Sequence, residues 1–240
     1  MNSTSYEDGT KNSVDVNKII EFMQYIGRLK HIKRTGWVRK NIPDPETISG
    51  HMYRMAMLSF LVDPKKNLNK SKLIEMALVH DLAECIVGDI TPFCGISPED
   101  KHKMEKEAMN EICKDLGERG KEILNIFVEY EERQSPEARY VKDLDRVDFL
   151  MQAFEYEERG NKPGQLQEFF DNCKEKLQDP LLSDVVEEIK CRRKALKLKK
   201  TNNNSYVFVS VAVLFITIGA GLLFKLINMF TNGPVLNFNY

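Results

Sequence analysis

The sequence predicts an all-α fold followed by a single C-terminal transmembrane helix. Apolar residues recur at three- and four-residue spacing through most of the 240-residue chain, which is the period of helices that bury one face. Alternating apolar and polar runs, which are typical of strands, are scarce. Residues 206–224 form a run of nineteen without a charge, long enough at about 1.5 Å per residue to cross roughly 30 Å of hydrocarbon.

These patterns divide the chain into five parts. They are a disordered lead (1–13), a helical domain (14–197), a polar linker (198–205), a transmembrane anchor (206–230) and a short translocated tail (231–240). The bases that precede the apolar run favour a cytosolic near side. The sequence therefore predicts a single-pass, tail-anchored membrane protein with its domain in the cytosol. The alternative for the apolar run is a buried C-terminal core helix.

Composition limits the classes of partner. With 42% hydrophobic and 30% charged residues, the chain is typical of globular proteins. Five cysteines, an odd number without a CxxC pair, favour a reduced compartment, and Cys85 is expected to pack in the core. Residues 190–200 hold seven bases and no acid, a run suited to contact with anionic headgroups. Removing those seven charges from the net −1 leaves −8 for the remainder, which argues against a surface that binds nucleic acid.

The domain begins with an amphipathic helix from about residue 14. A basic segment follows and breaks at Gly36, after which Pro43 and Pro45 enforce an extended crossing. A second helix is expected over 46–62, with His51 one turn inside it. The apolar positions of the first helix are Ile19, Ile20, Met23 and Ile26.

A third helix is expected from an N-cap at Ser71 to about Gly88. An irregular loop follows, and the next helix is mostly charged, which predicts a solvated outer element. Serines that precede a proline and an acidic residue predict two further N-caps, and prolines mark two more boundaries. These positions are Ser97, Ser135, Pro163 and Pro180.

The third predicted helix holds a stripe of polar side chains. Ala77, His80, Asp81 and Glu84 stand at helical spacing. Leaving buried polar groups without partners costs roughly 2–7 kcal/mol, and a divalent cation is a common partner of adjacent His and Asp. A His-Asp pair also arises by chance, and a lone His or Asp is more often a satisfied core or capping group. A metal site therefore requires further ligands from elsewhere in the chain.

Two further candidates lie on other predicted helices. They are His51 and Asp145, and Asp145 shares an inner stripe with Val141, Leu144 and Asp148. Two imidazoles and two carboxylates form a mixed donor set that suits Mn²⁺, Co²⁺, Fe²⁺, Zn²⁺ or Mg²⁺. The donor types leave the choice among these metals open.

Three segments resemble the HD-domain metal-dependent phosphohydrolases. They are HMYRMA around His51, ALVHDLAECIVGDITP around His80 and Asp81, and VKDLDRVDF around Asp145. Within that superfamily, the chain resembles the HD domain-containing protein 2 group, relatives of the bacterial 5′-deoxynucleotidases. LKHIKRTGWVRKN, the EYE of 155–157 and NKPGQLQEF also resemble this group. The resemblance extends over about residues 16–190, and it makes the predicted 14–197 domain an HD-domain helical bundle.

The resemblance implies a first metal site. Its ligands match His51, His80, Asp81 and Asp145 by position. A metal there would supply hydroxide at neutral pH and neutralise phosphate oxygens. No cysteine or serine nucleophile is then needed.

The resemblance also implies a second cation site at Glu84, Asp89 and Ile90, with Ile90 contributing only its backbone oxygen. Glu84 matches a residue that acts in proton transfer in the bacterial relatives. Asp81 and Glu84 are therefore the expected catalytic residues.

Substrate contacts follow from the same resemblance. Trp37 matches an aromatic residue that lies against the sugar, where its bulk could exclude a 2′-hydroxyl. Gly36 stands where the bacterial enzymes have an arginine, so the phosphate contact is expected to fall to Arg34 or Arg39, or to be lost. The loop residues that match the substrate-contacting stretch are Asp89, Thr91 and Pro92.

The sequence thus predicts a metal-dependent 5′-deoxynucleotidase that hydrolyses deoxyribonucleoside 5′-monophosphates with Mn²⁺, Co²⁺, Mg²⁺ or Zn²⁺. By analogy with the group, it is expected to be a homodimer. Two alternatives stay open. One is another HD-type phosphohydrolase, a phosphodiesterase or a triphosphohydrolase, and the other is a non-catalytic, membrane-anchored adaptor that binds nucleotide.

Overall fold

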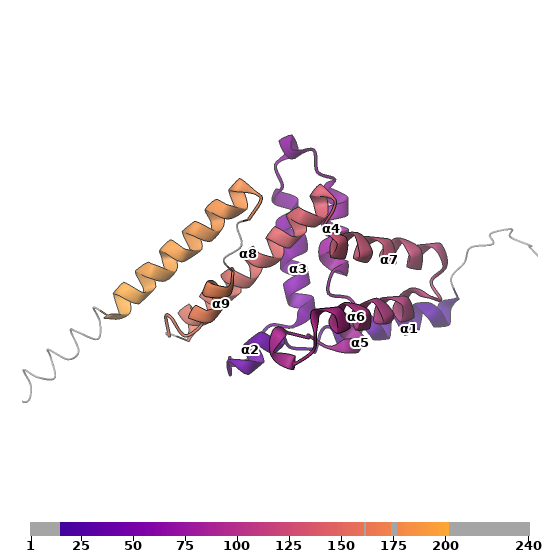
Figure 1. Ribbon diagram of the computed structural model, residues 1–240, viewed down its shortest axis with the longest axis horizontal. Helices are drawn as coiled ribbons and strands as arrows, with labels where there is room; N and C mark the ends of the chain where they lie inside the picture. The colour runs from indigo at the N-terminus through magenta and orange to yellow at the C-terminus, as the bar shows by residue number, and fades with distance from the viewer. Residues whose placement is uncertain (1–14, 161, 174–176, 202–240) are drawn as a thin grey trace, which may run out of the picture.

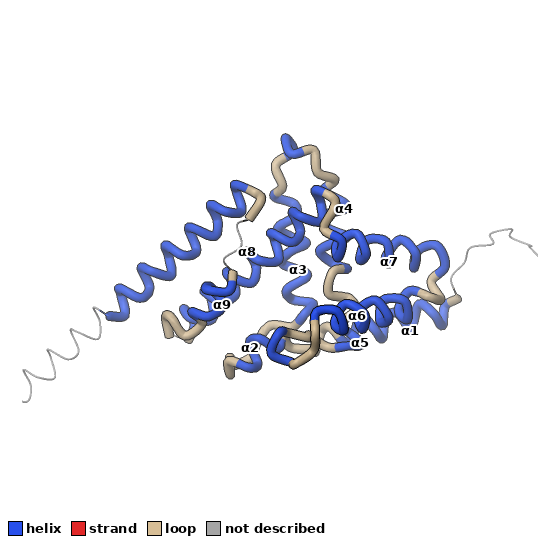
Figure 2. Tube along the Cα trace, viewed as in Figure 1, coloured by secondary structure: helices blue, strands red, loops and turns tan. Residues whose placement is uncertain are grey.

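The structure, a computed structural model, describes residues 15–160, 162–173 and 177–201. In these ranges the chain is helical, with one isolated bridge between Lys33 and Thr47 (Figures 1 and 2). The predicted all-α domain is confirmed for this part of the chain. The boundaries of the predicted 14–197 domain stay a prediction.

Nine α-helices carry labels in Figure 1, and three short 3₁₀ turns connect some of them. The α-helices are α1 (Val16–Arg28), α2 (Thr35–Arg39), α3 (Ile48–Leu58), α4 (Lys70–Val79), α5 (Glu84–Val87), α6 (Pro98–Cys113), α7 (Gly117–Glu132), α8 (Pro136–Arg159) and α9 (Gln167–Asn172). The 3₁₀ turns are η1 (Ser59–Leu61), η2 (Pro64–Lys66) and η3 (Pro92–Cys94). Residues 180–201 form a further helix.

Two of the predicted N-caps are confirmed. The hydroxyls of Ser97 and Ser135 each accept a hydrogen bond from the amide three residues on, at 3.0 and 3.1 Å, and thereby begin α6 and α8. The predicted cap at Ser71 is wrong, because α4 begins two residues earlier. There Asn69 accepts a hydrogen bond from the amide of Lys72 at 3.2 Å. Asparagine caps a helix as well as serine does, so the earlier residue takes the role.

The 24-residue helix α8 lies at the centre of the fold (Figure 1). It packs against α3, α4 and α7. A larger apolar cluster surrounds it, and a smaller one lies around α6 and the end of α1. The predicted solvated helix, α6, buries one side in this smaller cluster through Ala108, Met109 and Ile112. The candidate metal ligands of α3, of α8 and of the residues that follow α4 meet between these helices.

The EYE motif at the end of α8 joins three other segments. Glu155 accepts a hydrogen bond from Arg54 of α3 at 2.8 Å. The hydroxyl of Tyr156 accepts one from a backbone amide of the segment before α3, at 2.7 Å. Glu157, which is fully buried, binds Arg193 of the final helix through both carboxylate oxygens, at 2.7 and 2.9 Å. The motif therefore fixes the final helix and α3 to α8.

Replacing Arg193 with methionine is expected to destabilise the fold by about 3–5 kcal/mol, because it leaves the buried carboxylate of Glu157 without its cationic partner. The guanidinium is itself buried and stacks at 3.9 Å over the ring of Phe170. Thermal unfolding of Arg193→Met beside the wild type measures the loss.

The matched control is Arg192→Met, whose parent side chain is exposed and pairs with Glu188 on the surface. It should leave the unfolding midpoint unchanged. Burial raises the pKa of Glu157, but Arg193 outweighs burial and holds that pKa below its ordinary 4.5. The stabilisation is therefore present above pH 4.5 and is lost as the pH falls through the lower folded value. An equal loss in both variants would contradict the assignment.

The prediction of a C-terminal transmembrane helix is corrected. Of the residues that the structure describes, none belongs to a helix with both the length and the apolar character needed to cross a bilayer. The helix 180–201 holds the basic run, whose charges are costly in hydrocarbon. The predicted anchor, 206–230, lies outside the described residues, as do the predicted lead and tail. The predicted membrane partner and tail-anchored localisation are withdrawn with the anchor.

Candidate metal centre

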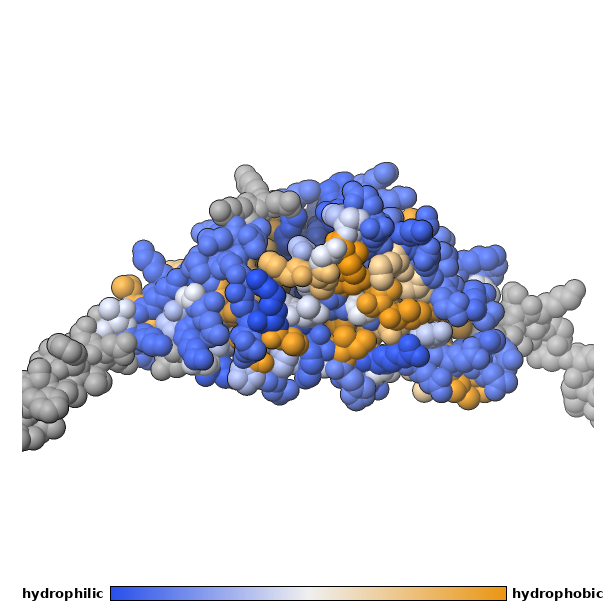
Figure 3. Space-filling model, turned by 60° about the horizontal axis from the view of Figure 1, so that its bottom comes forward, coloured by the Kyte–Doolittle hydropathy of each residue, from blue (hydrophilic) through white to orange (hydrophobic). Residues whose placement is uncertain are grey.

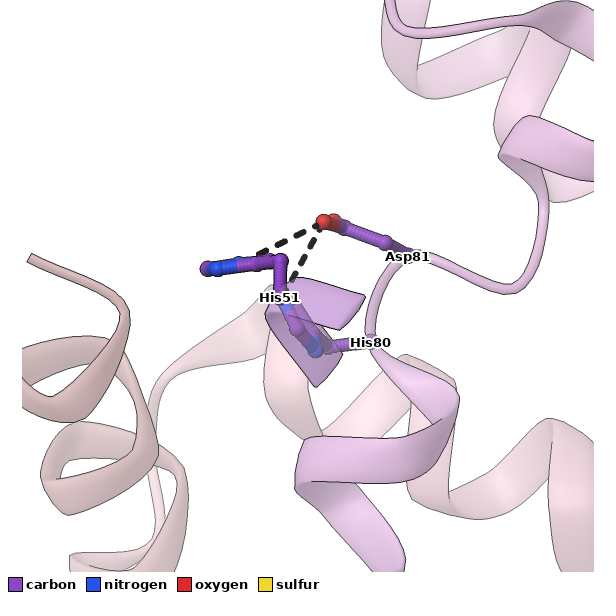
Figure 4. A group of neighbouring side chains, drawn as sticks. All are labelled: His51, His80 and Asp81. Carbon is purple, nitrogen blue, oxygen red and sulfur yellow. Dashed lines mark ion pairs between the residues drawn. The ribbon is translucent and has the colours of Figure 1, made fainter. Parts of the chain in front are cut away.

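Side chains from three parts of the chain converge between α3, α4 and α8. His51 comes from α3, His80 and Asp81 follow α4, and Asp145 comes from α8. The Nε2 atom of His80 lies 3.2 Å from Oδ2 of Asp81, and Nε2 of His51 lies 3.8 Å from the same oxygen (Figure 4). The Nε2 atom of His51 is also 3.3 Å from Oδ1 of Asp145. Each candidate ligand of the first site thus lies close to another.

The polar stripe arises differently from the way the sequence predicted. Instead of one helix to Gly88, α4 ends at Val79 and α5 begins at Glu84. Between them the backbone tightens, because the amide of Glu84 bonds to the carbonyl of Asp81, three residues back, at 3.1 Å. Residues three apart overlie each other in such turns. Asp81 and Glu84 therefore still lie on one side.

The two imidazoles present unpartnered nitrogens to this centre. The Nδ1 atom of His51 lies 2.6 Å from Oδ2 of Asp148, and Nδ1 of His80 lies 2.9 Å from the carbonyl of Ala77. An oxygen acceptor at Nδ1 holds a proton on that nitrogen, so Nε2 is the nitrogen that can bind a metal. Both Nε2 atoms are buried and have no hydrogen-bond partner.

This arrangement fits a divalent cation. Ligands about 2.1 Å from one cation stand about 3.0 Å apart in octahedral and about 3.4 Å apart in tetrahedral coordination. His51, His80 and Asp81 form a group of donors within 4.8 Å of one another. A cation between them would satisfy the two unpartnered nitrogens.

Cationic side chains hold the two carboxylates ionised. Arg34 donates to Oδ2 of Asp81 at 3.1 Å, and Lys142 donates to Oδ2 of Asp145 at 2.7 Å. Burial raises the pKa of Asp81, but His80 and Arg34 outweigh it and hold that pKa well below its ordinary value. Burial likewise raises the pKa of Asp145, and Lys142 and the histidines hold it well below.

His51 responds to the same charges. Burial and Arg34 lower the pKa of His51, but Asp145 and Asp148 outweigh them and raise it to about 9. A cation that binds Nε2 must displace the proton there, so its binding releases a proton to solvent.

Glu84 presents a second unpartnered group. Its side chain is 3% exposed, and its Oε2 atom is buried without a hydrogen-bond partner. Burial raises its pKa well above the ordinary value, and the charges of Asp81 and Asp89 add to this rise against Arg34 and Lys101. A carboxyl group whose pKa is raised toward the working pH suits proton transfer in catalysis.

The predicted second cation set lies at the start of α5 and in the loop that follows this helix. Asp89 accepts a hydrogen bond from the amide of Thr35 at 2.6 Å, and its carbonyl accepts the Thr35 hydroxyl at 2.7 Å. Ile90 is buried. Asp89 lies near enough to Glu84 for its charge to raise the pKa of Glu84. Another close group of donors forms from Glu46, His51 and Asp148, but a hydrogen bond already joins the last two.

Trp37 does not face solvent. Its side chain is fully buried, stacks on Phe149 with ring centroids 5.0 Å apart, and donates to Oε1 of Glu46 at 2.8 Å. The expected contact with a sugar has no open surface in this structure. The large aromatic side chains of α8 and α9 account for the burial, and they lie more than a hundred residues away in the sequence.

The remaining expected substrate residues lie on the surface. Arg39 pairs with Glu168 at 2.7 Å and stacks at 3.5 Å over the ring of Phe93. Thr91 precedes η3 and Pro92 opens it. Cys85 is 3% exposed, so its expected packing role is confirmed, and burial raises its pKa to about 11.

The structure adds four side chains to which the sequence analysis assigned no role. Asp148 and Arg54 support His51, and Lys142 and Tyr130 surround the outer oxygen of Asp145, at 2.7 and 3.4 Å. Asp148 stands three residues after Asp145 on the inner stripe of α8, and that spacing was the signal available for it.

The fold and this centre define an HD domain. The family model described as "HD domain" matches residues 26–185, and the chain belongs to that family. It is 47% identical over 179 residues to "5′-deoxynucleotidase HDDC2" from Danio rerio. The aligned region covers 72% of this chain and 88% of the relative. The protein of the same name from Homo sapiens is 41% identical over 190 residues, 79% of this chain and 93% of the relative.

A solved structure supports the same assignment. The PH0347 protein from Pyrococcus horikoshii OT3 is 31% identical, with a TM-score of 0.58 over 74% of this chain and 99% of that one. This chain therefore spans nearly the whole length of the relatives that it matches.

Proposed function

We propose that this chain is a metal-dependent 5′-deoxynucleotidase that hydrolyses deoxyribonucleoside 5′-monophosphates to deoxynucleoside and phosphate. The observation that carries the proposal is the pair of unpartnered Nε2 atoms of His51 and His80 beside two ionised carboxylates. The chain presents this site in an HD domain that covers 88–93% of two relatives named 5′-deoxynucleotidase.

His51, His80, Asp81 and Asp145 hold the cation in this proposal. A divalent cation acts as a Lewis acid on phosphate oxygens and on water. Mixed imidazole and carboxylate donors suit Mn²⁺ and Co²⁺, with Mg²⁺ and Zn²⁺ as alternatives. Asp81 contributes most to the site because it lies within 3.8 Å of both imidazoles.

Glu84 is the proton donor in the proposed reaction. Its raised pKa favours the protonated form, which can donate to the departing 5′-oxygen of the nucleoside. In its ionised form, Glu84 would ligate a second cation together with Asp89 and the backbone oxygen of Ile90. The hydrogen bonds from Thr35 to Asp89 hold that loop against α2.

Arg34 is the better candidate for the phosphate contact. Its guanidinium lies beside Asp81 and is 15% exposed, so it already borders the cation site. Arg39 is committed to Glu168 and Phe93. Thr91 and Pro92 border the nucleoside. Trp37 acts from behind the site, by holding Glu46 within 4.0 Å of Arg34.

The assembly proposed is a homodimer. Helix α1 lies near the bottom of Figure 1 and exposes a set of apolar side chains, and Figure 3, in which the bottom of the molecule comes forward, shows apolar side chains gathered on that side. An antiparallel pair of α1 helices would bring Asp15 opposite Arg28 of the copy. Sedimentation of the full chain should give twice the chain mass, and a monomer would overturn this part of the proposal. The exposed set comprises Val16, Ile19, Ile20, Met23 and Ile26.

The experiment is a phosphate-release assay on the EDTA-stripped full chain. Restoring Mn²⁺ or Co²⁺ should release phosphate from dAMP, dGMP and dCMP, and EDTA should abolish the release. Deoxynucleoside triphosphates, cyclic nucleotides and AMP are assayed in parallel. Turnover confined to triphosphates or cyclic nucleotides would replace the proposal with another HD-type phosphohydrolase. Nucleotide binding without turnover in any metal would indicate a non-catalytic nucleotide-binding protein.

A further inference from the structure

A buried chain of charges lies behind His51, on the side away from the cation site. The Nδ1 atom of His51 lies 2.6 Å from Oδ2 of Asp148, and both side chains are fully enclosed. Arg54 donates through Nε to the other oxygen, Oδ1, of the same carboxylate. Each oxygen of Asp148 thus has a partner.

Arg54 is itself fixed by α8. Its NH1 group donates to Glu155 at 2.8 Å, and its NH2 group donates to the side-chain oxygen of Gln152 at 2.8 Å. Asp148, Gln152 and Glu155 stand at helical spacing on one side of α8, and His51 and Arg54 stand three apart on α3. The two helices therefore present matched rows of side chains.

The charge of Arg54 matters when a cation is present. A metal-bound imidazole is neutral, so His51 then cannot balance the buried negative charge of Asp148. An unbalanced buried carboxylate is costly. Arg54 supplies the compensating charge and binds the oxygen of Asp148 that His51 does not contact, so the other oxygen stays directed at Nδ1.

We propose that Asp148 and Arg54 are positioning residues of the cation site: Asp148 orients His51 with Nε2 toward the cation, and Arg54, bound to the other oxygen of the same carboxylate, fixes Asp148 in that position. The inference rests on the proposed metal site. Removal of such a hydrogen-bond partner from a metal-ligating histidine lowers metal affinity by about 10–100-fold. A purely structural pair would join α3 to α8 without altering affinity.

The test compares Mn²⁺ affinity, by calorimetry on the EDTA-stripped full chain, in the wild type, Asp148→Asn, Arg54→Met and Arg54→Lys. Asp148→Asn should weaken binding by about 10–100-fold. An asparagine can donate to Nδ1, which moves the imidazole proton to Nε2 and blocks that nitrogen. Arg54→Met should also weaken binding. Arg54→Lys keeps the charge and should recover part of the affinity.

The matched control is Asp143→Asn, which alters another buried aspartate of α8. Asp143 accepts hydrogen bonds from the amides of Gln178 and Asp179 at 2.7 and 2.9 Å, and so supports the start of the final helix. It should lower the unfolding midpoint in EDTA and leave Mn²⁺ affinity unchanged. Arg54, 29% exposed, tolerates substitution better than Asp148, so it keeps the test decisive if Asp148→Asn does not fold.

The inference would be overturned, and the proposed function left intact, if Asp148→Asn and Arg54→Met both bind Mn²⁺ with wild-type affinity. If Asp148→Asn does not fold, wild-type affinity in Arg54→Met alone would overturn it. A wild-type chain that binds no Mn²⁺ would overturn the metal site itself. The affinity measurement does not depend on turnover, so the two failures are distinguishable.

Discussion

Asp81→Asn is expected to abolish phosphate release from dAMP in the presence of Mn²⁺. Among the described residues, Asp81 is the carboxylate within 3.8 Å of the Nε2 atoms of both His51 and His80. An amide oxygen lacks the negative charge of a carboxylate and therefore attracts a divalent cation less strongly. The loss of activity should therefore exceed the loss of about 10–100-fold that follows when the hydrogen-bond partner of a metal ligand is altered. The affinity for Mn²⁺ should fall as well.

The fold should survive this substitution, because asparagine keeps the shape of the side chain and Arg34 keeps Glu46 within 4.0 Å as a second ion-pair partner. Circular dichroism in EDTA should match the wild type. The control is Asp115→Asn, which changes an exposed aspartate that pairs with Lys18 and should keep full activity. Equal turnover in Asp81→Asn and the wild type would remove the cation from the mechanism.

Glu84→Gln is expected to lower kcat by about 10²–10⁴, the range for a lost general acid or base. The amide has the same shape but cannot transfer the proton. Because burial raises the pKa of Glu84, the site should accept a neutral side chain of the same shape, and glutamine should not lower the unfolding midpoint. The expected signature is a fall in kcat with little change in the affinity of the first cation.

Glu105→Gln is the matched control, since Glu105 is also a buried glutamate and pairs with Lys101 at 3.4 Å. Its kcat should stay near the wild-type value. A Glu84→Gln variant that retains wild-type kcat would contradict the proton-transfer role, and an equal loss in both variants would point to a general effect of removing buried charge.

Local chemistry made much of the fold predictable. The Ser-Pro-acid signals at Ser97 and Ser135 name the starts of α6 and α8 because a capping hydroxyl satisfies helix amides from within its own turn. The four candidate ligands of the first site were also identified from the sequence. Their convergence needs three helices to pack, so it followed from resemblance and not from spacing.

Features that depend on contacts distant in sequence were not predictable. The end of α4 at Val79 reflects a tightened backbone at the site, and the residues from 80 to 84 carry no glycine or proline to signal it. Trp37 is buried by Phe149, Tyr156 and Phe169, and nothing near Trp37 in the sequence shows them. Its expected sugar contact rested on position alone.

The position of Asp148 was predictable from the sequence, but its role was not. Its place on the inner stripe of α8 was evident, but a buried aspartate can be a ligand, a cap or a partner of a ligand. The role of Asp148 depends on His51 of α3, which lies ninety-seven residues away in the sequence and contacts Asp148 through Nδ1.

The membrane anchor was predicted from the hydropathy of an apolar run alone, and the described helices lack any such span.

The central claim is that helices from three parts of the chain bring two imidazoles and two carboxylates to one cation. A crystal of the full chain grown with Mn²⁺, with anomalous data collected at the manganese edge, tests it most directly. The account predicts a strong peak about 2.0–2.3 Å from His51 Nε2, His80 Nε2 and an oxygen each of Asp81 and Asp145. The absence of a peak at this position, or a peak that leaves Asp145 or either imidazole outside coordination distance, would contradict it.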